Sequence, residues 1–213
     1  MLPTNARGSV GGVRIGAGRF RNALLPQVGP DVRPVGGRLR QSLFTALLPV
    51  LDGARVLDLC AGVGGLGLEA LSQGAASVVL VESDRRTADA LRRWAADRGC
   101  AAEITVVVGD ARRAPVAPGP YDLVFLDPPF AVWADAEAAR AFVAAAVAAA
   151  GPSGLVAVKL PSRAAIPDDP RWRCVERRPQ GDVAWAWVRA AVAPAPPAGP
   201  SVGALDAESP PAP

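Results

Sequence analysis

An acid, two prolines and an aromatic residue follow an apolar run near the middle of the chain. The run, residues 121–126, has the continuous hydrophobic character of a buried parallel strand. Neither proline can donate a strand hydrogen bond, so the strand ends there and holds the acid and the ring at its carboxyl edge. Ligands bind at that edge in open α/β sheets. The four residues, which we predict to be catalytic, are Asp127, Pro128, Pro129 and Phe130.

These residues suit a planar substrate that carries an amino group. The lone pair of a nucleobase amine is delocalised into the ring, which makes the amine a poor nucleophile. Acceptors at the Asp127 carboxylate and the Pro128 carbonyl would orient the amine, and the Phe130 ring would stack on the base. Attack on an activated methyl group then depends mainly on proximity and alignment. The motif therefore predicts methylation of an amine.

A glycine-rich turn follows an earlier predicted strand, at residues 55–59. Its glycines have the G-x-G-x-x-G spacing that is typical of a nucleotide-binding turn before a helix. The next strand ends in Glu82, 20 residues beyond the first of these glycines, where a carboxylate would accept hydrogen bonds from ribose hydroxyls. Neither feature distinguishes NAD from S-adenosylmethionine. The three glycines are Gly62, Gly64 and Gly67.

Asp58, near the end of the first strand, distinguishes these two cofactors. A carboxylate beside the glycine turn would attract the ammonium and sulfonium groups of S-adenosylmethionine and repel the pyrophosphate of NAD. Asp110, which follows the third strand, is a candidate acceptor for the adenine amino group. The predicted cofactor contacts, all at the ends of strands or in the turns after them, are Asp58, Cys60, Ala61, Gly62, Gly64, Gly67, Glu82, Ser83, Asp110 and Ala111.

Only a parallel sheet would bring these residues to one edge. Strand and helix patterns alternate along the chain, which predicts a doubly wound, mostly parallel α/β sheet. The last two strands are separated by five turn-forming residues and are expected to form an antiparallel hairpin, and residues 11–21 are expected to form short strands. The other expected strands are 55–59, 78–82, 104–108, 122–127, 154–160, 171–177 and 183–189, and the expected helices are 36–51, 65–73, 84–98 and 135–150.

Positive charge is concentrated at the start of the 213-residue chain. Residues 1–44 carry seven arginines and one acid, Asp31, whereas the remainder carries 16 basic and 19 acidic residues. A basic arm on a mildly acidic body is typical of a polyanion-binding extension, although a GC-rich genome would also favour arginine over lysine. Lys159 is the only lysine. The arginines predicted to contact RNA are Arg14, Arg19, Arg21, Arg33, Arg38 and Arg40.

The composition predicts one folded domain with less ordered ends. We expect a basic RNA-binding extension at 1–50, disordered over 1–10, a catalytic domain at 51–192, and a disordered tail rich in proline and alanine at 193–213. The N-terminus lacks the apolar core of a signal peptide, and the longest apolar stretch is too short to span a bilayer, so a cytoplasmic protein is expected.

The residues that are missing or few exclude several kinds of chemistry. The chain has no histidine, which excludes Ser-His and Cys-His catalysis and histidine-ligated metals. Its three cysteines are widely spaced and have no metal-binding pattern. We therefore expect neither a bound metal nor disulfides.

Together these motifs resemble the class I methyltransferases that use S-adenosylmethionine and carry an (Asp/Asn)-Pro-Pro-(Phe/Tyr) motif. More closely, they resemble the RsmD-type 16S ribosomal RNA (guanine-N2)-methyltransferases, over about residues 13–189. The amine motif alone is shared with DNA adenine and protein glutamine methyltransferases, whereas its occurrence with an Arg-Pro…Arg-x-Arg…Leu-Phe segment is far more specific. The matching segments are 13–21, 33–34, 38–44, 57–72, 81–84, 127–130 and 181–183.

The resemblance implies a Rossmann-like fold and a monomeric enzyme that methylates the N2 amine of one guanine in small-subunit ribosomal RNA. It also implies S-adenosylmethionine as the cofactor and a basic N-terminal region that binds the RNA. One segment departs from the family pattern Arg-Pro-Thr-x-Asp-Arg-x-Arg-Glu and so leaves its contacts with cofactor and substrate open. Val35, Gly36, Gly37 and Gln41 replace the threonine, the residue after it, the aspartate and the glutamate.

Three other functions remain open from the sequence. Methylation of adenine N6 in DNA or RNA uses the same chemistry, but no segment for reading DNA sequence is evident. An NAD-dependent oxidoreductase would lack a histidine for proton relay and would have Tyr121 as its only tyrosine. A non-catalytic RNA-binding protein would have no need for the acids at positions 58, 82 and 127.

Overall fold

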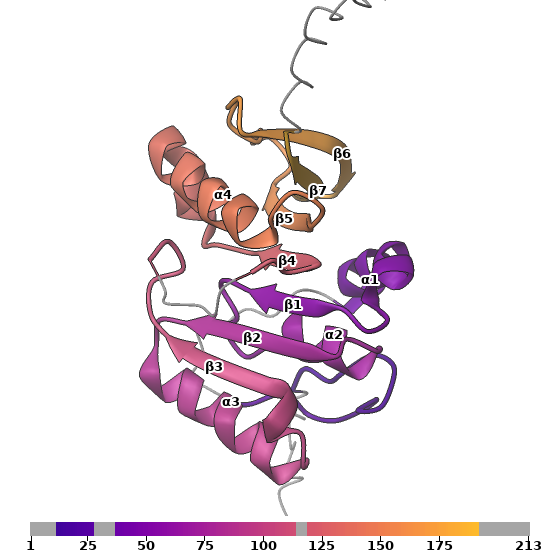
Figure 1. The fold of residues 1–213 in the computed structure, drawn as a ribbon. Coiled ribbons are helices and arrows are strands. Elements are labelled where there is room, and N and C mark those ends of the chain that lie inside the picture. The colour runs from indigo at the N-terminus through magenta and orange to yellow at the C-terminus, as the bar shows by residue number, and fades with distance from the viewer. Residues whose placement is uncertain (1–11, 28–36, 114–118, 192–213) are drawn as a thin grey trace, which may run out of the picture.

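The computed structural model describes residues 12–27, 37–113 and 119–191 (Figure 1). Seven strands form one sheet in the order β3-β2-β1-β4-β5-β7-β6. The first five strands along the chain are parallel, whereas β7 runs antiparallel to β5 and β6 antiparallel to β7. The structure confirms the predicted Rossmann-like sheet that ends in an antiparallel hairpin. Its strands are β1 (Arg55–Asp58), β2 (Ser77–Glu82), β3 (Ile104–Val108), β4 (Leu123–Leu126), β5 (Leu155–Pro161), β6 (Trp172–Gln180) and β7 (Val183–Ala190).

The helices lie where the hydrophobic spacing predicts them, and acidic caps fix two of their starts. The Asp84 carboxylate accepts a hydrogen bond from the Thr87 backbone N–H at 2.8 Å, and the Asp135 carboxylate accepts bonds from the first turn of the last helix. Among the described residues no helix is long and apolar enough to cross a membrane. The helices are α1 (Gly37–Leu51), α2 (Gly67–Ser72), α3 (Arg85–Asp97) and α4 (Ala136–Ala150).

Two short elements were not predicted, and one predicted element has a different form. The 3-10 helices η1 (Ala101–Glu103) and η2 (Phe130–Ala134) are too short to show a periodic pattern. The prediction of short strands over 11–21 was wrong in detail. Residues 12–27 form a narrow hairpin with one antiparallel bridge, between Arg14 and Leu24, because the chain turns back sharply at 18–22.

Two apolar clusters cover the two faces of the sheet. The first cluster joins one face to α1, α2 and α3, and the second joins the other face to α4 (Figure 1). The N-terminal hairpin packs on the first face, because Ile15 and Leu25 lie in the first cluster. The Trp94 indole N–H of α3 also donates to the Leu24 carbonyl at 2.8 Å. The described part of the predicted basic extension therefore shares its core with the sheet.

β6 forms one outer edge of the sheet. Every side chain of this strand beyond Trp172 is exposed, and within the described residues the strand pairs only with β7. Pro179 lies within it, which an edge strand tolerates because proline lacks the N–H that a central strand would need.

Candidate active site

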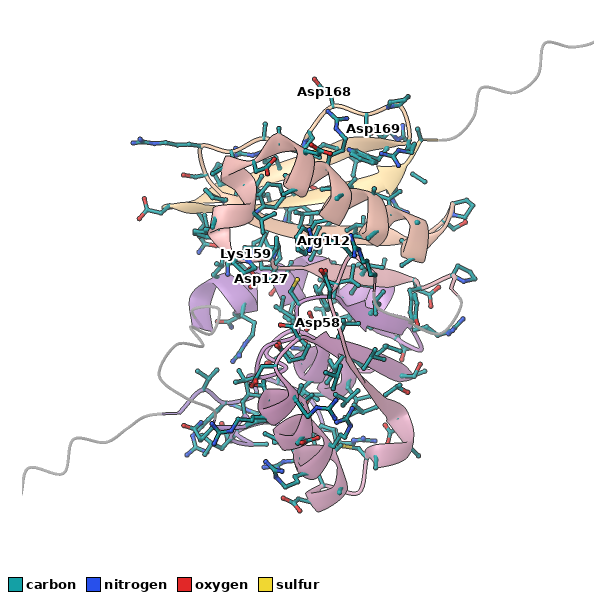
Figure 2. All side chains as sticks on the ribbon, turned by 90° about the vertical axis from the view of Figure 1, so that its left-hand side faces the viewer. Asp58, Arg112, Asp127, Lys159, Asp168 and Asp169 are labelled. Atoms are coloured by element: carbon teal, nitrogen blue, oxygen red, sulfur yellow. The ribbon has the colours of Figure 1, made fainter. Side chains whose placement is uncertain are left out.

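Four charged side chains reach the carboxyl edge of the sheet on its first face. The odd-numbered residues of β4 and β5 pack in the first cluster and the even-numbered residues in the second. Because side chains alternate along a strand, this pattern places Asp127 and Lys159 on the first face. The same alternation along β1 and β2 places Asp58 and Glu82 there. Figure 2 shows Asp58, Asp127 and Lys159 gathered near the middle of the molecule.

Asp127 and Lys159 form an ion pair at this edge. Leu126 of β4 lies opposite Val158 of β5, so the next residues of the two parallel strands are neighbours. The Lys159 ammonium donates to both carboxylate oxygens of Asp127, with each Nζ–Oδ distance 2.9 Å. Burial raises the pKa of the Asp127 carboxyl above its ordinary value, and the Lys159 charge limits that rise.

The Asp-Pro-Pro-Phe segment presents its ring to solvent. Pro128 is buried, and the Pro129 carbonyl accepts the Val132 N–H at 2.9 Å, which starts η2. The Phe130 side chain leaves the sheet at this turn and is 44% exposed, an unusual position for so large an apolar group. The centre of its ring lies 5.5 Å from the Lys159 Nζ. The ring is thus available to stack on a planar ligand beside Asp127.

The glycine turn is tied to two of the predicted acids. The Gly62 N–H donates to Glu82 Oε2 at 2.8 Å, and the Gly67 N–H donates to Asp58 Oδ2 at 3.0 Å. Glu82 also accepts from the Asp84 N–H at 2.8 Å and from the Ser83 hydroxyl at 3.2 Å. These bonds join the ends of β1 and β2 to the loop between β1 and α2.

The geometry of this turn favours glycine at all three motif positions. Gly62 and Gly64 have φ values of 52° and 81°, which L side chains rarely adopt. Gly67 packs so closely on the sheet that a Cβ there would lie 2.4 Å from a methyl carbon of Leu80. This close approach lets the start of α2 reach the end of β1, as a nucleotide-binding turn requires.

Asp58 is the most perturbed acid of the site. Its side chain is 1% exposed, and its Oδ1 has no hydrogen-bond partner among the described residues. Burial raises the pKa of Asp58 to about 7, and the charges of Asp127 and Glu82 add to the rise. Burial and the same acids raise the pKa of the Cys60 thiol well above its usual range, so Cys60 is an inert part of the loop.

The remaining predicted cofactor residues lie along the same edge. Asp110 accepts hydrogen bonds from the Arg112 guanidinium, with a Nε–Oδ1 distance of 3.0 Å, and this contact lowers the pKa of Asp110 to about 2. Ala61 is buried in the glycine loop, and Ala111 packs against the second cluster. Asp110 is therefore a charged acceptor, although Arg112 already occupies it.

The described arginines of the N-terminal hairpin differ in their surroundings. Arg14 and Arg21 are exposed, and Arg14 donates to the Asn22 carbonyl at 2.8 Å. Arg19 forms an exposed ion pair with Glu103 at 2.8 Å. All three side chains remain in contact with solvent.

The prediction that Arg40 contacts RNA is wrong, because its side chain is buried. Its guanidinium lies 3.3 Å from the Glu69 carboxylate, with side-chain exposures of 7% and 2%, and it also donates to the Arg14 carbonyl. Glu69 in turn accepts from the backbone N–H groups of Gly16 and Ala17 at 2.8 and 3.0 Å. Arg40 therefore connects α1 to the N-terminal hairpin and α2.

Several predicted residues lie outside the described part of the chain. Arg33, Val35 and Gly36 fall in 28–36, and the Arg38 side chain is likewise not described. Gly37 and Gln41, the other departures from the family pattern, are exposed in the first turns of α1.

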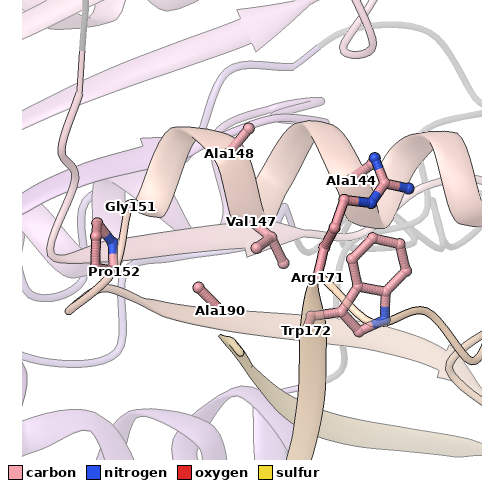
Figure 3. A pocket seen from close by; sticks show the side chains of 8 residues that line it. All are labelled: Ala144, Val147, Ala148, Gly151, Pro152, Arg171, Trp172 and Ala190. Carbon is pink, nitrogen blue, oxygen red and sulfur yellow. The ribbon is translucent and has the colours of Figure 1, made fainter. Parts of the chain in front are cut away.

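A separate hollow of about 280 Å³ lies far from this edge (Figure 3). It is formed by the end of α4 and the start of β6, which both lie at the amino edge of the sheet. Its lining is mostly apolar, with Val147, Trp172 and Ala190 among its side chains, and none of the described residues that line it is an acid. The hollow therefore lacks the groups that the predicted chemistry needs.

Two residues of this region had no predicted role. Lys159 is the sole lysine in a chain with 22 arginines, and this rarity could have marked it as a residue with a role. Glu69 is an acid within the apolar stretch 66–71, where an exposed position is not expected. The structure places Lys159 in the candidate site and Glu69 beneath the N-terminal hairpin.

The chain is similar to known proteins over nearly all of its described length. A profile of the family described as conserved hypothetical protein 95 matches residues 13–189. "Ribosomal RNA small subunit methyltransferase D" of Escherichia coli strain K12 is 41% identical over 132 residues, and that of Haemophilus influenzae is 37% identical over 131. These matches cover 61% and 59% of this chain, and 66% of each relative, slightly under two thirds of its length.

Solved structures give the same picture for the fold. The putative methyltransferase yhhF from Escherichia coli superposes with a TM-score of 0.69 at 31% identity, covering 84% of this chain and 97% of its own. A putative methylase from Haemophilus influenzae superposes with a TM-score of 0.65 at 28% identity, covering 84% and 98%.

Proposed function

This chain belongs to the family described as conserved hypothetical protein 95, the RsmD-type methyltransferases, and on that premise we propose that it methylates small-subunit ribosomal RNA. We propose further that the methyl donor is S-adenosylmethionine and that the acceptor is the N2 amine of a guanine. The observation that carries this proposal is that Asp127, whose partner Lys159 lies near the exposed Phe130 ring, interacts electrostatically with Asp58 and Cys60, where Asp58 and Glu82 are tied to the glycine turn.

The residues of the turn fit S-adenosylmethionine. Asp58 Oδ1 is a buried acceptor without a partner among the described residues, which suits a cationic group. Glu82 keeps acceptor capacity for a ribose hydroxyl, since its Oε2 accepts only the Gly62 N–H within the described chain and has a second lone pair. Gly64 leaves the turn free of a side chain. We assign Asp58, Glu82 and residues 60–67 to the cofactor.

Residues of the chain itself would orient the acceptor amine. When bound, S-adenosylmethionine supplies an electrophilic methyl group on its sulfonium. Asp127 accepts a hydrogen bond from the amine, and the Pro128 carbonyl accepts the other, which directs the nitrogen lone pair away from the base plane. Phe130 stacks on the base and fixes the position of the base relative to the Asp127 carboxylate. The proton leaves the nitrogen after transfer, so Asp127 need not be a strong base.

Transfer to ribosomal RNA tests this proposal directly. The protein would be incubated with labelled S-adenosylmethionine and small subunits from a strain that lacks the corresponding enzyme. Mass spectrometry of the digested RNA is expected to show N2-methylguanosine. N6-methyladenosine in its place would support the adenine alternative, and no labelled nucleoside in either free RNA or subunits would contradict the proposed activity.

Binding of the donor is expected to depend on pH through Asp58. A cation requires the ionised carboxylate, and with a pKa of about 7 this form predominates at pH 8 but not at pH 6. Calorimetry should therefore show binding of S-adenosylmethionine about tenfold weaker at pH 6 than at pH 8, with release of a proton at the lower pH. Asp58→Asn should remove this dependence. Tight binding of NAD would contradict the cofactor assignment.

We infer that the exposed hairpin arginines contribute to RNA binding. Arg14 and Arg21 lie on the described N-terminal hairpin, where neither forms an ion pair within the described chain. Arginine is suited to bidentate contact with phosphate oxygens. Arg19 shares its charge with Glu103, and Arg40 is buried, so both are weaker candidates.

Replacing both exposed arginines should reduce the salt dependence of RNA binding. For Arg14→Gln with Arg21→Gln, the slope of log K against log salt should decrease by about 1.4 to 1.8, because each phosphate contact contributes about 0.7 to 0.9. Filter binding across a series of salt concentrations measures it. Arg173→Gln with Arg189→Gln removes the same charge at the amino edge of the sheet and is the matched control. Equal slopes for the two double variants would exclude the hairpin from the interface.

A further inference from the structure

The Asp127–Lys159 pair is built into the sheet rather than formed by two mobile surface chains. Both residues directly follow paired positions of neighbouring strands, and their side chains are 18% and 13% exposed. The ammonium is 2.9 Å from each carboxylate oxygen, a contact that fixes the plane of the carboxylate. The Phe130 ring centre lies 5.5 Å from the same ammonium, so one cation contacts both the acid and the aromatic group of the motif.

The surroundings of Asp127 otherwise oppose its negative charge. The groups that interact with it electrostatically are Asp58 and Cys60 from β1 and its loop, and Lys159 from β5. Glu82 and Asp110 lie nearby, since both act on the same Cys60 thiol. Within the described part of the chain, Lys159 is the cation that contacts Asp127. Without it, Asp127 would be a largely buried carboxylate among other acids, and such groups take up a proton.

We propose that Lys159 is a positioning residue for methyl transfer: its ammonium keeps Asp127 negatively charged and holds the carboxylate in the plane that the acceptor amine must meet. The inference rests on the proposed amine methylation. Only the ionised carboxylate offers acceptors on both oxygens, whereas a protonated one would present an O–H donor toward the hydrogens of the amine. Each oxygen retains a second lone pair when Lys159 is bound, so the amine can be accepted without displacement of the lysine.

The pH profile of the rate distinguishes this role from a merely structural one. Loss of an opposite charge at this distance raises the pKa of a carboxyl by about 1 to 3 units. For Lys159→Met, the acidic limb of kcat should therefore move upward by about 1 to 3 pH units, because protonated Asp127 orients the amine less well than the carboxylate does, and protonation persists until the pH exceeds the raised pKa. At pH values well below both acidic limbs the variant should be about tenfold or more slower than the unmodified protein, and well above them it should approach the unmodified rate. A loss by the same factor at every pH would overturn the proposal.

One assay condition and three control variants isolate the effect at Asp127. The measurements are made at saturating S-adenosylmethionine, so that ionisation of Asp58 does not contribute. Lys159→Arg keeps the cation and should keep the limb in place. Arg92→Met removes a charge from an exposed pair on α3 and should leave the profile unchanged. In an Asp127→Asn background, Lys159→Met should no longer shift any limb, and a shift that persists there would assign it to another group.

A second measurement needs no substrate, so it separates this inference from the proposed function. Because Lys159 is the only lysine, protein labelled with ¹³C-lysine gives a single side-chain methylene signal next to its ammonium. That signal should report the titration of Asp127 in the unmodified protein and lose this inflection in Asp127→Asn. Identical titration curves for the two proteins would overturn the pairing. If the pairing is seen but no RNA is methylated, the proposed function fails and the ion pair stands.

Discussion

Replacement of Asp127 by alanine is expected to lower the rate of methyl transfer by about 10²- to 10³-fold, which is typical for loss of one oriented hydrogen-bonding group. The affinity for S-adenosylmethionine should change little, because Asp58, Glu82 and the glycine turn are untouched. The loss should appear in kcat measured by single-turnover transfer of a labelled methyl group to small subunits. A fully active variant would contradict the role of the carboxylate.

Two other substitutions give this result its meaning. Asp127→Asn keeps one acceptor oxygen and should retain more activity than alanine. Asp122→Ala removes an acid that precedes the same strand, where its carboxylate accepts the Arg55 backbone N–H at 2.8 Å at the opposite edge of the sheet. It should transfer methyl groups at the unmodified rate. Similar losses in Asp122→Ala and Asp127→Ala would indicate disruption of β4 rather than loss of a contact with the amine.

Replacement of Glu69 by alanine should lower the stability of the fold more than replacement of Arg40 or of Glu103. Its carboxylate accepts the N–H groups of Gly16 and Ala17 and the Gln73 side-chain amide, and it neutralises buried Arg40. Removing it leaves the two backbone N–H groups without an acceptor. It also leaves the buried guanidinium with only a carbonyl partner. We expect the free energy of unfolding to fall by about 3 to 5 kcal/mol. Denaturation by urea, followed by tryptophan fluorescence, measures this change.

The same kind of pair at the surface provides the comparison. Glu103→Ala removes the partner of Arg19, whose side chain is about half exposed, and should cost about 0 to 1 kcal/mol. Arg40→Met should cost less than Glu69→Ala, since Glu69 would keep its three N–H donors. Equal losses for Glu69→Ala and Glu103→Ala would show that the buried cluster contributes no more than a surface contact.

The sheet was predictable because its local signals agree with one another. The two prolines after Asp127 mark the end of one strand. The apolar residues of β1 lead into the glycine turn, and those of β2 end in an acid. These patterns are local in sequence, and the alternation of strand and helix patterns along the chain predicts a mostly parallel sheet. The Rossmann-like fold and the RsmD-type family were both confirmed.

The orientation of Arg40 was missed although the sequence contained a signal for it. Arg40 precedes Leu43, Phe44 and Leu47 at the helical spacing of three, four and seven residues, which places it on the apolar stripe of α1. Counting charges treats every arginine as exposed, whereas the helical spacing identifies Arg40 as buried. Glu69 within its apolar helix is the matching partner, but their pairing depends on how α1 packs on α2.

The Asp127–Lys159 pair could not be predicted by local reasoning. Alternation along β5 shows that Lys159 shares a face with Ala157, but not which strand lies beside it. The contact depends on the register of β4 against β5, and residues 32 positions apart in the chain set that register. Long-range pairing of this kind is a property of the assembled sheet.

The exposed strand β6 also bears on how this protein behaves in concentrated solution. An open sheet edge offers unpaired N–H and C=O groups, which can template a strand from another molecule. Here Pro179 removes one donor from that edge, Arg173 and Arg177 add positive charge, and Arg178 forms an ion pair with Glu176. A bulge between Cys174 and Glu176 interrupts the regular spacing. The proline, the charged side chains and the bulge of this edge strand thus protect the sheet against edge-to-edge aggregation.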